Sequence, residues 1–236
     1  MRVLLLAAGL GTRLRSLTNT MPKCLVPIGG RPLLGIWLER LTQAGMGPFL
    51  VNTHYFAEQV ERFVQSSPYR DQVTLVHEND LLGTAGTLMA NLGFFKDEDG
   101  MLIHADNYCL ADFRAFVQAH RQRPAPCVMT MMIFRAEAPS SCGIVELDDR
   151  GVVVGFHEKV VNPPGNLANG AVYVVSAELL KTLGSEMRDV KDFSTEVLPR
   201  LVGRICTYET SAAFVDVGSP ENYARANNSH GCNKHA

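Results

Sequence analysis

Several features that mark large classes of protein are missing from this chain. Its 236 residues include no lysine- or arginine-rich run and no long apolar run, and its formal net charge is only −2. A membrane-spanning helix needs about 20 consecutive apolar residues, and binding to nucleic acid or to an anionic membrane needs concentrated positive charge. We therefore expect no nucleic-acid partner and no membrane partner.

Cysteine and histidine also lack an informative pattern. The six cysteines and seven histidines are scattered, with no C-x-x-C pair and no two histidines four residues apart. This spacing indicates neither a zinc site nor a disulfide framework, so we expect reduced cysteines. The N-terminus begins as a strand and has no basic segment followed by an apolar segment and a cleavage site. We expect a cytoplasmic location.

Apolar strand-like segments alternate with segments of helical spacing over the first half of the chain. This alternation predicts an α/β fold, with helices on both faces of a mostly parallel sheet. The expected strands lie at residues 2–7, 49–52, 73–77 and 101–105, and the expected helices at 33–44, 58–64, 86–92 and 113–121.

The second half of the chain has a different pattern. Apolar segments at 143–147 and 152–156 are joined by D-D-R-G, which predicts a β-hairpin. Further strands are expected at 171–175, 205–209 and 214–217, and a short helix at 178–183. We predict one domain over residues 1–226, whose second half is partly antiparallel, and a loose tail over the polar residues 227–236.

The first 23 residues combine a strand, a glycine loop and two cations. The apolar run at 3–6 leads into A-A-G-L-G-T at 7–12, and Arg13 and Lys23 lie ten residues apart. Gly9 and Gly11 have no Cβ, so their backbone can approach a ligand closely, and loop N–H groups can bind phosphate. Arg13 offers a planar fork and Lys23 a mobile point charge. The loop therefore predicts a site for a nucleoside triphosphate, formed by Ala7, Ala8, Gly9, Gly11 and Thr12.

Other glycine loops fit this segment less well. A dinucleotide-binding loop would have a third glycine where Leu14 stands, and the chain has no G-x-x-x-x-G-K-[ST] phosphate loop. On the glycines alone, an ordinary strand-to-helix turn with a surface arginine remains an alternative. Arg13 and Lys23 favour phosphate.

Two aspartates lie at the ends of predicted strands. Asp106 comes directly after the strand at 101–105, and Asp216 lies near the end of the segment 214–217. Ligands bind at the carboxyl ends of parallel strands, and Mg²⁺ commonly takes one or two carboxylates together with substrate phosphates. Together with the phosphate-binding loop, the pair therefore predicts a magnesium site, although either aspartate alone could be a helix cap or a turn residue.

The motif L-L-L-A-A-G-L-G-T-R-L at 4–14, followed by P-K at 22–23, resembles the sugar-phosphate nucleotidylyltransferase family. The similarity continues in order to about Tyr223. It implies a Rossmann-like three-layer α/β/α sandwich in which a sugar-1-phosphate oxygen attacks the α-phosphorus of a nucleoside triphosphate and pyrophosphate leaves. It assigns Mg²⁺ to Asp106 and Asp216, and catalytic roles to Arg13, Lys23 and Lys159. Because the chain stops soon after Tyr223, we expect no appended acyltransferase repeat domain.

The resemblance also implies a sugar-phosphate site. The Glu158-Lys159 pair corresponds to the family's Glu-Lys pair, although Val160 follows it where proline is usual. Gly143 corresponds to a glycine that contacts the sugar. The segment that begins at Asn169 resembles N-A/S-G-I/V-Y, with the small residue between asparagine and glycine absent. Asn107 completes the expected set, and a solvated charge pair is the alternative for 158–159.

The segment L-G-T-A-G at 82–86 resembles the guanylyltransferase branch, whose acceptors are mannose- or heptose-type phosphates. Gly83, Thr84 and Glu78 are expected to contact the base. An ionised carboxylate only accepts hydrogen bonds, so Glu78 would suit the adjacent donors of guanine; an exposed glutamate is the alternative. We expect GTP as donor and, from the family, allow a homodimer. A UTP- or dTTP-dependent enzyme, or a non-catalytic sugar-nucleotide-binding regulator, remains open.

Overall fold

The computed structural model describes residues 1–232. The chain divides into two compact units. We call one the N-terminal unit; it comprises Arg2–Leu81, Ile103–Ala111 and the chain from Ala212 onward. We call the other the central unit; it comprises Met1, Leu82–Leu102 and Asp112–Ser211. The predicted organisation as one domain stays a prediction.

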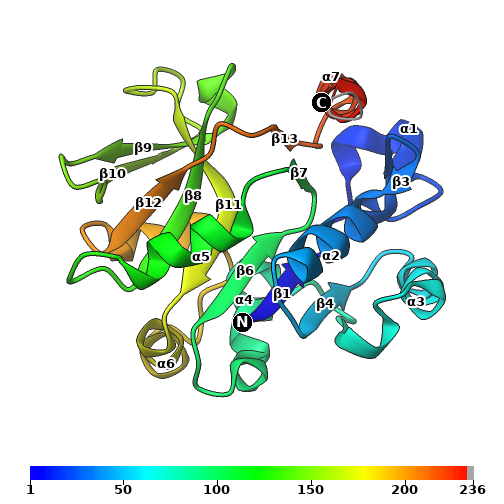
Figure 1. The fold of residues 1–236 in the computed structure, drawn as a ribbon, viewed down its shortest axis with the longest axis horizontal. Coiled ribbons are helices and arrows are strands. Elements are labelled where there is room, and N and C mark those ends of the chain that lie inside the picture. The colour runs from blue at the N-terminus through cyan, green and yellow to red at the C-terminus, as the bar shows by residue number, and fades with distance from the viewer. Residues whose placement is uncertain (233–236) are drawn as a thin grey trace. The chain divides into compact units, whose positions relative to one another are not determined.

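The N-terminal unit is built on parallel strands (Figure 1). Strand β4 (Phe49–Thr53) pairs in parallel with β1 (Arg2–Leu6) on one side and with β5 (Val73–His77) on the other. All five residues of β4 are buried, and its apolar part F-L-V fits the apolar strands of parallel sheets. Strand β6 (Gly100–His104) ends in this unit, where the Ala105 N–H donates to the Leu6 carbonyl at 2.9 Å.

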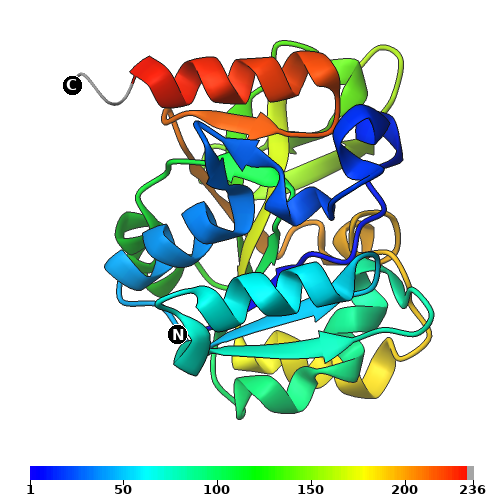
Figure 2. The same cartoon turned by 90° about the vertical axis from the view of Figure 1, so that its right-hand side faces the viewer.

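Two helices of the N-terminal unit follow from apolar spacing. Helix α2 (Leu33–Gln43) buries Leu34, Trp37, Leu38 and Leu41, which recur every three or four residues along one face. Helix α3 (Ala57–Ser66) buries Val60 and Val64 in the same way, and it lies beside β4 and β5 (Figure 2).

The rest of the N-terminal unit consists of short elements and the C-terminal helix. Strand β13 (Phe214–Asp216) pairs antiparallel with β7 (Asn107–Cys109). Figure 2 shows α7 (Pro220–Cys232), in red, running alongside β13. The remaining short pieces are the 3₁₀ turns Thr12–Leu14, Lys23–Leu25 and Arg70–Gln72, helix α1 (Arg15–Thr18), and strands β2 (Pro27–Ile28) and β3 (Arg31–Pro32).

The central unit is largely antiparallel. Strand β9 (Gly143–Leu147) forms a hairpin with β10 (Val153–Glu158), and β11 (Leu167–Val175) runs antiparallel to both β9 and β8 (Met129–Arg135). Strand β12 (Ile205–Glu209) is parallel to β8. The helices are α4 (Gly83–Ala90), α5 (Phe113–Arg121) and α6 (Ala177–Glu186), followed by a π-helical turn at Phe193–Val197; 3₁₀ turns lie at Leu92–Phe95, Pro139–Ser141 and Leu198–Leu201.

The predicted fold class is confirmed: the chain is α/β, with a largely parallel sheet and a partly antiparallel second half. The strands at 73–77, 143–147 and 205–209 and the helix at 113–121 have the predicted bounds. The predicted helix at 86–92 begins three residues earlier, at Gly83, and β8 was not predicted. Helix α7 covers residues 227–232, where the sequence led us to expect a loose tail; residues 233–236 lie outside the described residues.

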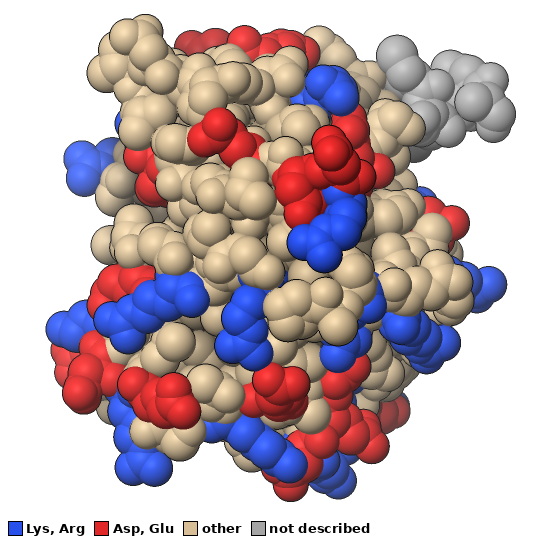
Figure 3. Space-filling model, turned by 90° about the vertical axis from the view of Figure 1, so that its left-hand side faces the viewer, with Lys and Arg blue, Asp and Glu red and all other residues tan. Residues whose placement is uncertain are grey.

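The surface charge and the hydropathy of the helices agree with the small net charge and the lack of long apolar runs in the sequence. On the face drawn in Figure 3, lysine and arginine lie among aspartate and glutamate, and neither sign forms a continuous field. Within residues 1–232, no helix is both long and apolar enough to cross a bilayer.

Candidate active site

The glycine loop follows directly from β1. Ala7 and Ala8 are buried at the end of the strand. Gly11 has φ 62° and ψ 30°, a left-handed conformation that favours glycine. A Cβ at Gly11 would lie 2.7 Å from Thr18 Cγ2, and the Thr18 hydroxyl donates to the Gly11 carbonyl at 2.8 Å. The loop therefore needs glycine at this position for two independent reasons.

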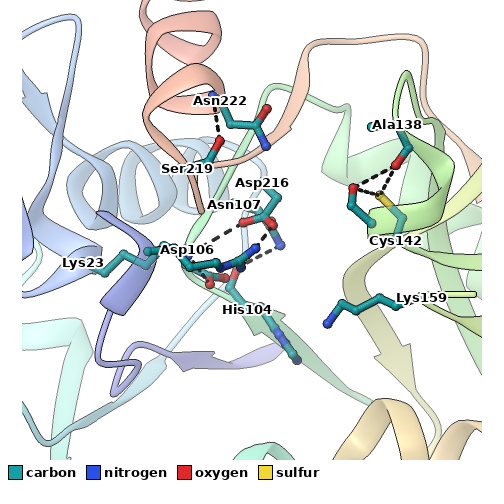
Figure 4. A network of polar contacts seen from close by, with 12 residues as sticks. Lys23, His104, Asp106, Asn107, Ala138, Cys142, Lys159, Asp216, Ser219 and Asn222 are labelled. Carbon is teal, nitrogen blue, oxygen red and sulfur yellow. Dashed lines mark hydrogen bonds and ion pairs between the residues drawn. The ribbon is translucent and has the colours of Figure 1, made fainter. Parts of the chain in front are cut away.

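The structure brings the predicted cations and aspartates of the N-terminal unit together (Figure 4). Lys23 Nζ lies 2.7 Å from Asp106 Oδ2 and 3.7 Å from Asp216 Oδ1. Arg13 Nη2 lies 3.9 Å from Asp216 Oδ2. The Lys23 side chain is only 7% exposed and that of Arg13 is 68% exposed. One cation is therefore buried inside the site, and the other reaches it from the exposed surface.

Strand ends place the two carboxylates. Asp106 follows β6, and Asp216 is the last residue of β13, opposite Asn107 of β7. The Val217 N–H donates to the Asp106 carbonyl at 3.1 Å. Gly218 leaves room for the cluster, since a Cβ there would lie 2.8 Å from Arg13 Nη2 and 2.9 Å from Asp216 Oδ1. The sequence analysis missed Gly218, although a glycine just after an aspartate at a strand end is a signal that could have found it.

Two opposing effects act on the pKa of the Asp106 carboxyl. Burial raises it, but the charge of Lys23, the nearby His104 and the hydrogen bond from Lys23 together lower the pKa below its ordinary value. Asp106 is therefore ionised at neutral pH and can act as a metal ligand.

The donor set of this cluster fits Mg²⁺. Asp106 and Asp216 offer hard carboxylate oxygens, and their side chains are 40% and 45% exposed. Among the described residues, no group of three or more histidine, cysteine or acidic side chains could hold a metal ion. Two carboxylates suit Mg²⁺, which completes its shell with water and substrate phosphate oxygens.

Glu78 is buried rather than exposed, and it lies against another side chain of the N-terminal unit. Its Oε1 accepts a hydrogen bond from Asn52 Nδ2 at 2.9 Å. Asn52 Oδ1 in turn accepts from the Ala7 N–H at 2.7 Å. The sequence analysis did not identify Asn52 as a partner of the glycine loop; the signal was a polar residue at the end of the buried run F-L-V.

Gly83 and Thr84 begin α4 in the central unit, and both are held by the segment at 191–193. Gly83 has φ 80°, and a Cβ there would collide with the Lys191 carbonyl oxygen. Thr84 Oγ1 accepts from the Phe193 N–H at 2.7 Å. These contacts give both residues a structural role in the central unit, and their contact with nucleotide stays a prediction.

Gly143, Glu158 and Lys159 lie together in the central unit. Glu158 is paired with Gly143 across the β9–β10 hairpin, and a Cβ on Gly143 would lie 2.6 Å from Glu158 Oε2. Lys159 Nζ lies 3.1 Å from Glu158 Oε1, with the lysine side chain 63% exposed and the glutamate side chain 24% exposed. The missing Cβ of Gly143 thus leaves space for the Glu158 carboxylate.

The segment after Asn169 corrects our interpretation of its motif. Asn169 and Tyr173 are separated as they are in N-A-G-I-Y, so no residue is absent; Gly170 and Ala171 stand in exchanged order. The β8–β11 register shifts between Asn169 and Tyr173, and Ala171 takes the left-handed φ of 51° that suits glycine. Asn169 Oδ1 accepts from the Ala171 N–H at 2.9 Å, and its Nδ2 donates to Tyr173 Oη at 2.7 Å.

Comparison with known proteins covers nearly the whole chain. Residues 2–231 match the family described as "Nucleotidyl transferase". The chain is 30% identical over 225 residues to the mannose-1-phosphate guanylyltransferase of Mycobacterium tuberculosis, covering 93% of this chain and 62% of the relative. It is 28% identical over 243 residues to the UTP–glucose-1-phosphate uridylyltransferase of Synechocystis sp., covering 96% of this chain and 62% of the relative. The chain thus spans about three fifths of the length of these relatives.

A solved structure agrees with the fold. HddC from Yersinia pseudotuberculosis, crystallised with GMP-PN, is 26% identical with a TM-score of 0.81, covering 97% of this chain and 99% of HddC.

Proposed function

Because this chain belongs to the nucleotidyl transferase family, we propose that it transfers a nucleotidyl group from a nucleoside triphosphate to a sugar-1-phosphate. The observation that carries the proposal is the cluster of Lys23, Asp106 and Asp216 beside the Gly11 loop, in which a buried ammonium contacts both carboxylates. Such a site neutralises the charge of a polyphosphate and holds its metal ion.

The reaction asks the protein for positioning and charge neutralisation. An oxygen of the sugar phosphate attacks the α-phosphorus, the bond from that phosphorus to the bridging oxygen breaks, and the electron pair leaves with pyrophosphate. The nucleophile needs no protein base, because the second pKa of a phosphate monoester is about 6. The loop N–H groups, Arg13 and Lys23 bind the phosphates. Asp106 and Asp216 would hold Mg²⁺, which supplies Lewis-acid neutralisation of phosphate charge when bound.

Residues of the central unit supply the sugar-phosphate contacts in this proposal. Lys159, exposed and next to Glu158, neutralises the phosphate of the sugar, and Glu158 accepts hydrogen bonds from sugar hydroxyls. The Gly143 backbone and Asn169 add further sugar contacts. In the N-terminal unit, Asn107 follows Asp106 in the chain and lies opposite Asp216 in the β7–β13 pair, next to the two carboxylates that we propose hold the metal.

We further propose that the donor is GTP and the acceptor a mannose- or heptose-type 1-phosphate. The L-G-T-A-G segment supports this choice, as does the similarity to a guanylyltransferase. A UTP- or dTTP-dependent enzyme is the alternative, favoured by the similarity to a uridylyltransferase. The homodimer and the cytoplasmic location stay predictions of the sequence.

The experiment that tests the function is a matrix of donors and acceptors. Pyrophosphate release is measured with GTP, UTP, dTTP, CTP and ATP against mannose-, glucose- and heptose-1-phosphates, with and without Mg²⁺. We expect turnover that requires Mg²⁺ and is fastest with GTP. Fast turnover with UTP and none with GTP would overturn the choice of base, and binding without turnover in every combination would favour the non-catalytic regulator.

A further inference from the structure

A buried chain of hydrogen bonds joins the ends of three neighbouring strands in the N-terminal unit. Asn52, at the end of β4, accepts from the backbone N–H of Ala7 at 2.7 Å, just after β1. The same amide donates to Glu78 Oε1 at 2.9 Å, just after β5. Asn52 is 3% exposed and Glu78 is 5% exposed. Low exposure makes such bonds strong and their loss costly.

The backbone around Glu78 is also fixed. Its N–H donates to the Thr53 carbonyl at 2.9 Å, and its own carbonyl oxygen lies 2.8 Å from His54 Nδ1. These contacts hold residue 78 against the end of β4, so the side chain reaches Asn52 from a defined direction.

The chemistry of Glu78 determines which way the Asn52 amide points. An ionised carboxylate only accepts hydrogen bonds, whereas an amide has one accepting and one donating end. Glu78 can therefore bind only the amino end of Asn52, which leaves the carbonyl end facing Ala7. A flipped amide would place oxygen against carboxylate and an amino group against the Ala7 N–H.

We propose that Glu78 is a positioning residue that acts through Asn52 to hold the backbone of Ala7, at the start of the nucleotide-binding loop. The proposal rests on the proposed function for the meaning of the loop. It gives Glu78 a task that is the same for every nucleotide, because the loop binds phosphates that all nucleoside triphosphates share. This differs from a direct contact between Glu78 and the base.

We call the hydrogen-bonded chain from Glu78 through Asn52 to the Ala7 N–H the relay. Exchanging the donor and acceptor groups of its two side chains tests it. Asn52→Asp keeps an oxygen for Ala7 but sets a second carboxylate against Glu78. We expect it to lower kcat/KM for every nucleoside triphosphate by about 100-fold, equivalent to about 2.7 kcal/mol. Adding Glu78→Gln restores a donor opposite the introduced carboxylate, so the double variant should recover at least about tenfold. Glu61→Gln on the exposed face of α3 is the matched control and should change nothing.

The single variant Glu78→Gln separates the relay from base recognition. Its carbonyl oxygen can still accept from Asn52, so we expect a loss of about threefold for all donors and a GTP-to-UTP preference within about twofold of wild type. A change of that preference by about tenfold or more would make Glu78 a base-reading residue and overturn the proposal. A double variant no more active than Asn52→Asp would overturn it as well.

Hydrogen exchange of the Ala7 amide provides a readout that needs no turnover, and Glu78→Gln, which keeps the accepting oxygen, is its matched comparison. In nucleotide-free wild-type protein we expect slow exchange, with faster exchange in Glu78→Leu and near wild-type exchange in Glu78→Gln. Equal rates in all three proteins would contradict the relay. If the wild type turns over no sugar phosphate, the proposed function fails while this measurement still decides the relay.

Discussion

The ammonium of Lys23 lies 2.7 Å from Asp106 Oδ2, although the Lys23 side chain is only 7% exposed. A buried lysine is stable as a cation only when it is paired. Asp106 and Asp216 supply that pairing, and Lys23 in turn keeps the Asp106 carboxyl ionised. The cluster therefore places the ionised carboxylate of Asp106 beside the Lys23 ammonium.

Replacing Asp106 by asparagine tests its proposed role in holding the metal. We expect kcat to fall at least about 100-fold, because metal-assisted charge neutralisation contributes several kcal/mol. Circular dichroism should show an intact fold, since asparagine keeps the size of the side chain. Asp71→Asn is the control, because Asp71 is 88% exposed in a 3₁₀ turn. Normal Mg²⁺-dependent turnover in the Asp106 variant would show that Asp106 is not a metal ligand.

The glycine loop should tolerate alanine at one glycine and not at the other. Gly11→Ala would force a left-handed alanine, which costs about 1–2 kcal/mol, and its Cβ would press on Thr18. Gly9→Ala would meet no atom within 4 Å. We expect urea denaturation to show a loss of more than about 1 kcal/mol for Gly11→Ala, and almost none for Gly9→Ala. Similar losses for both variants would contradict the loop geometry.

Ala171→Gly should stabilise the protein. Ala171 holds φ 51°, a conformation that costs alanine about 1 kcal/mol relative to glycine. The free energy of unfolding should therefore rise by about this amount in chemical denaturation. Ala168→Gly in the same strand is the comparison, and it should destabilise by about 0.5–1 kcal/mol. A loss of stability in Ala171→Gly would mean that the backbone at residue 171 is not strained.

His120 predicts a pH dependence of stability. Burial and the charge of Arg123 together lower the pKa of its imidazole to about 4, although Asp99 acts in the opposite direction. Because the pKa in the unfolded chain is about 6.5, unfolding takes up a proton between these two values. The free energy of unfolding should therefore fall as the pH falls from 6.5 toward 4, by roughly 1 kcal/mol per unit.

A variant isolates this contribution from the other titrating groups. His120→Gln can still bond Thr130, whose hydroxyl lies 2.7 Å from His120 Nδ1. Urea denaturation at several pH values should show a shallower slope for the variant than for the wild type. Equal slopes would exclude His120 as the source.

The sequence by itself determined the local elements and the chemical types of the site. Short apolar segments predicted β5, β9 and β12 to the residue, and helical spacing of apolar residues predicted α5, because these patterns depend only on residues close together in the chain. The glycine loop, its two cations and the aspartates at strand ends could also be identified from the sequence, since each is recognised from the residues next to it in the chain.

Only the tertiary structure decided which residues meet. Lys23 contacts Asp106 from 83 positions away, and Asp216 reaches them through the pairing of β13 with β7. The same holds for Glu78, whose partner Asn52 lies in β4, and for Ala171, whose left-handed backbone lies where the register against β8 shifts. Local propensity sets the conformation of a segment, but contacts between distant segments depend on how the whole chain packs.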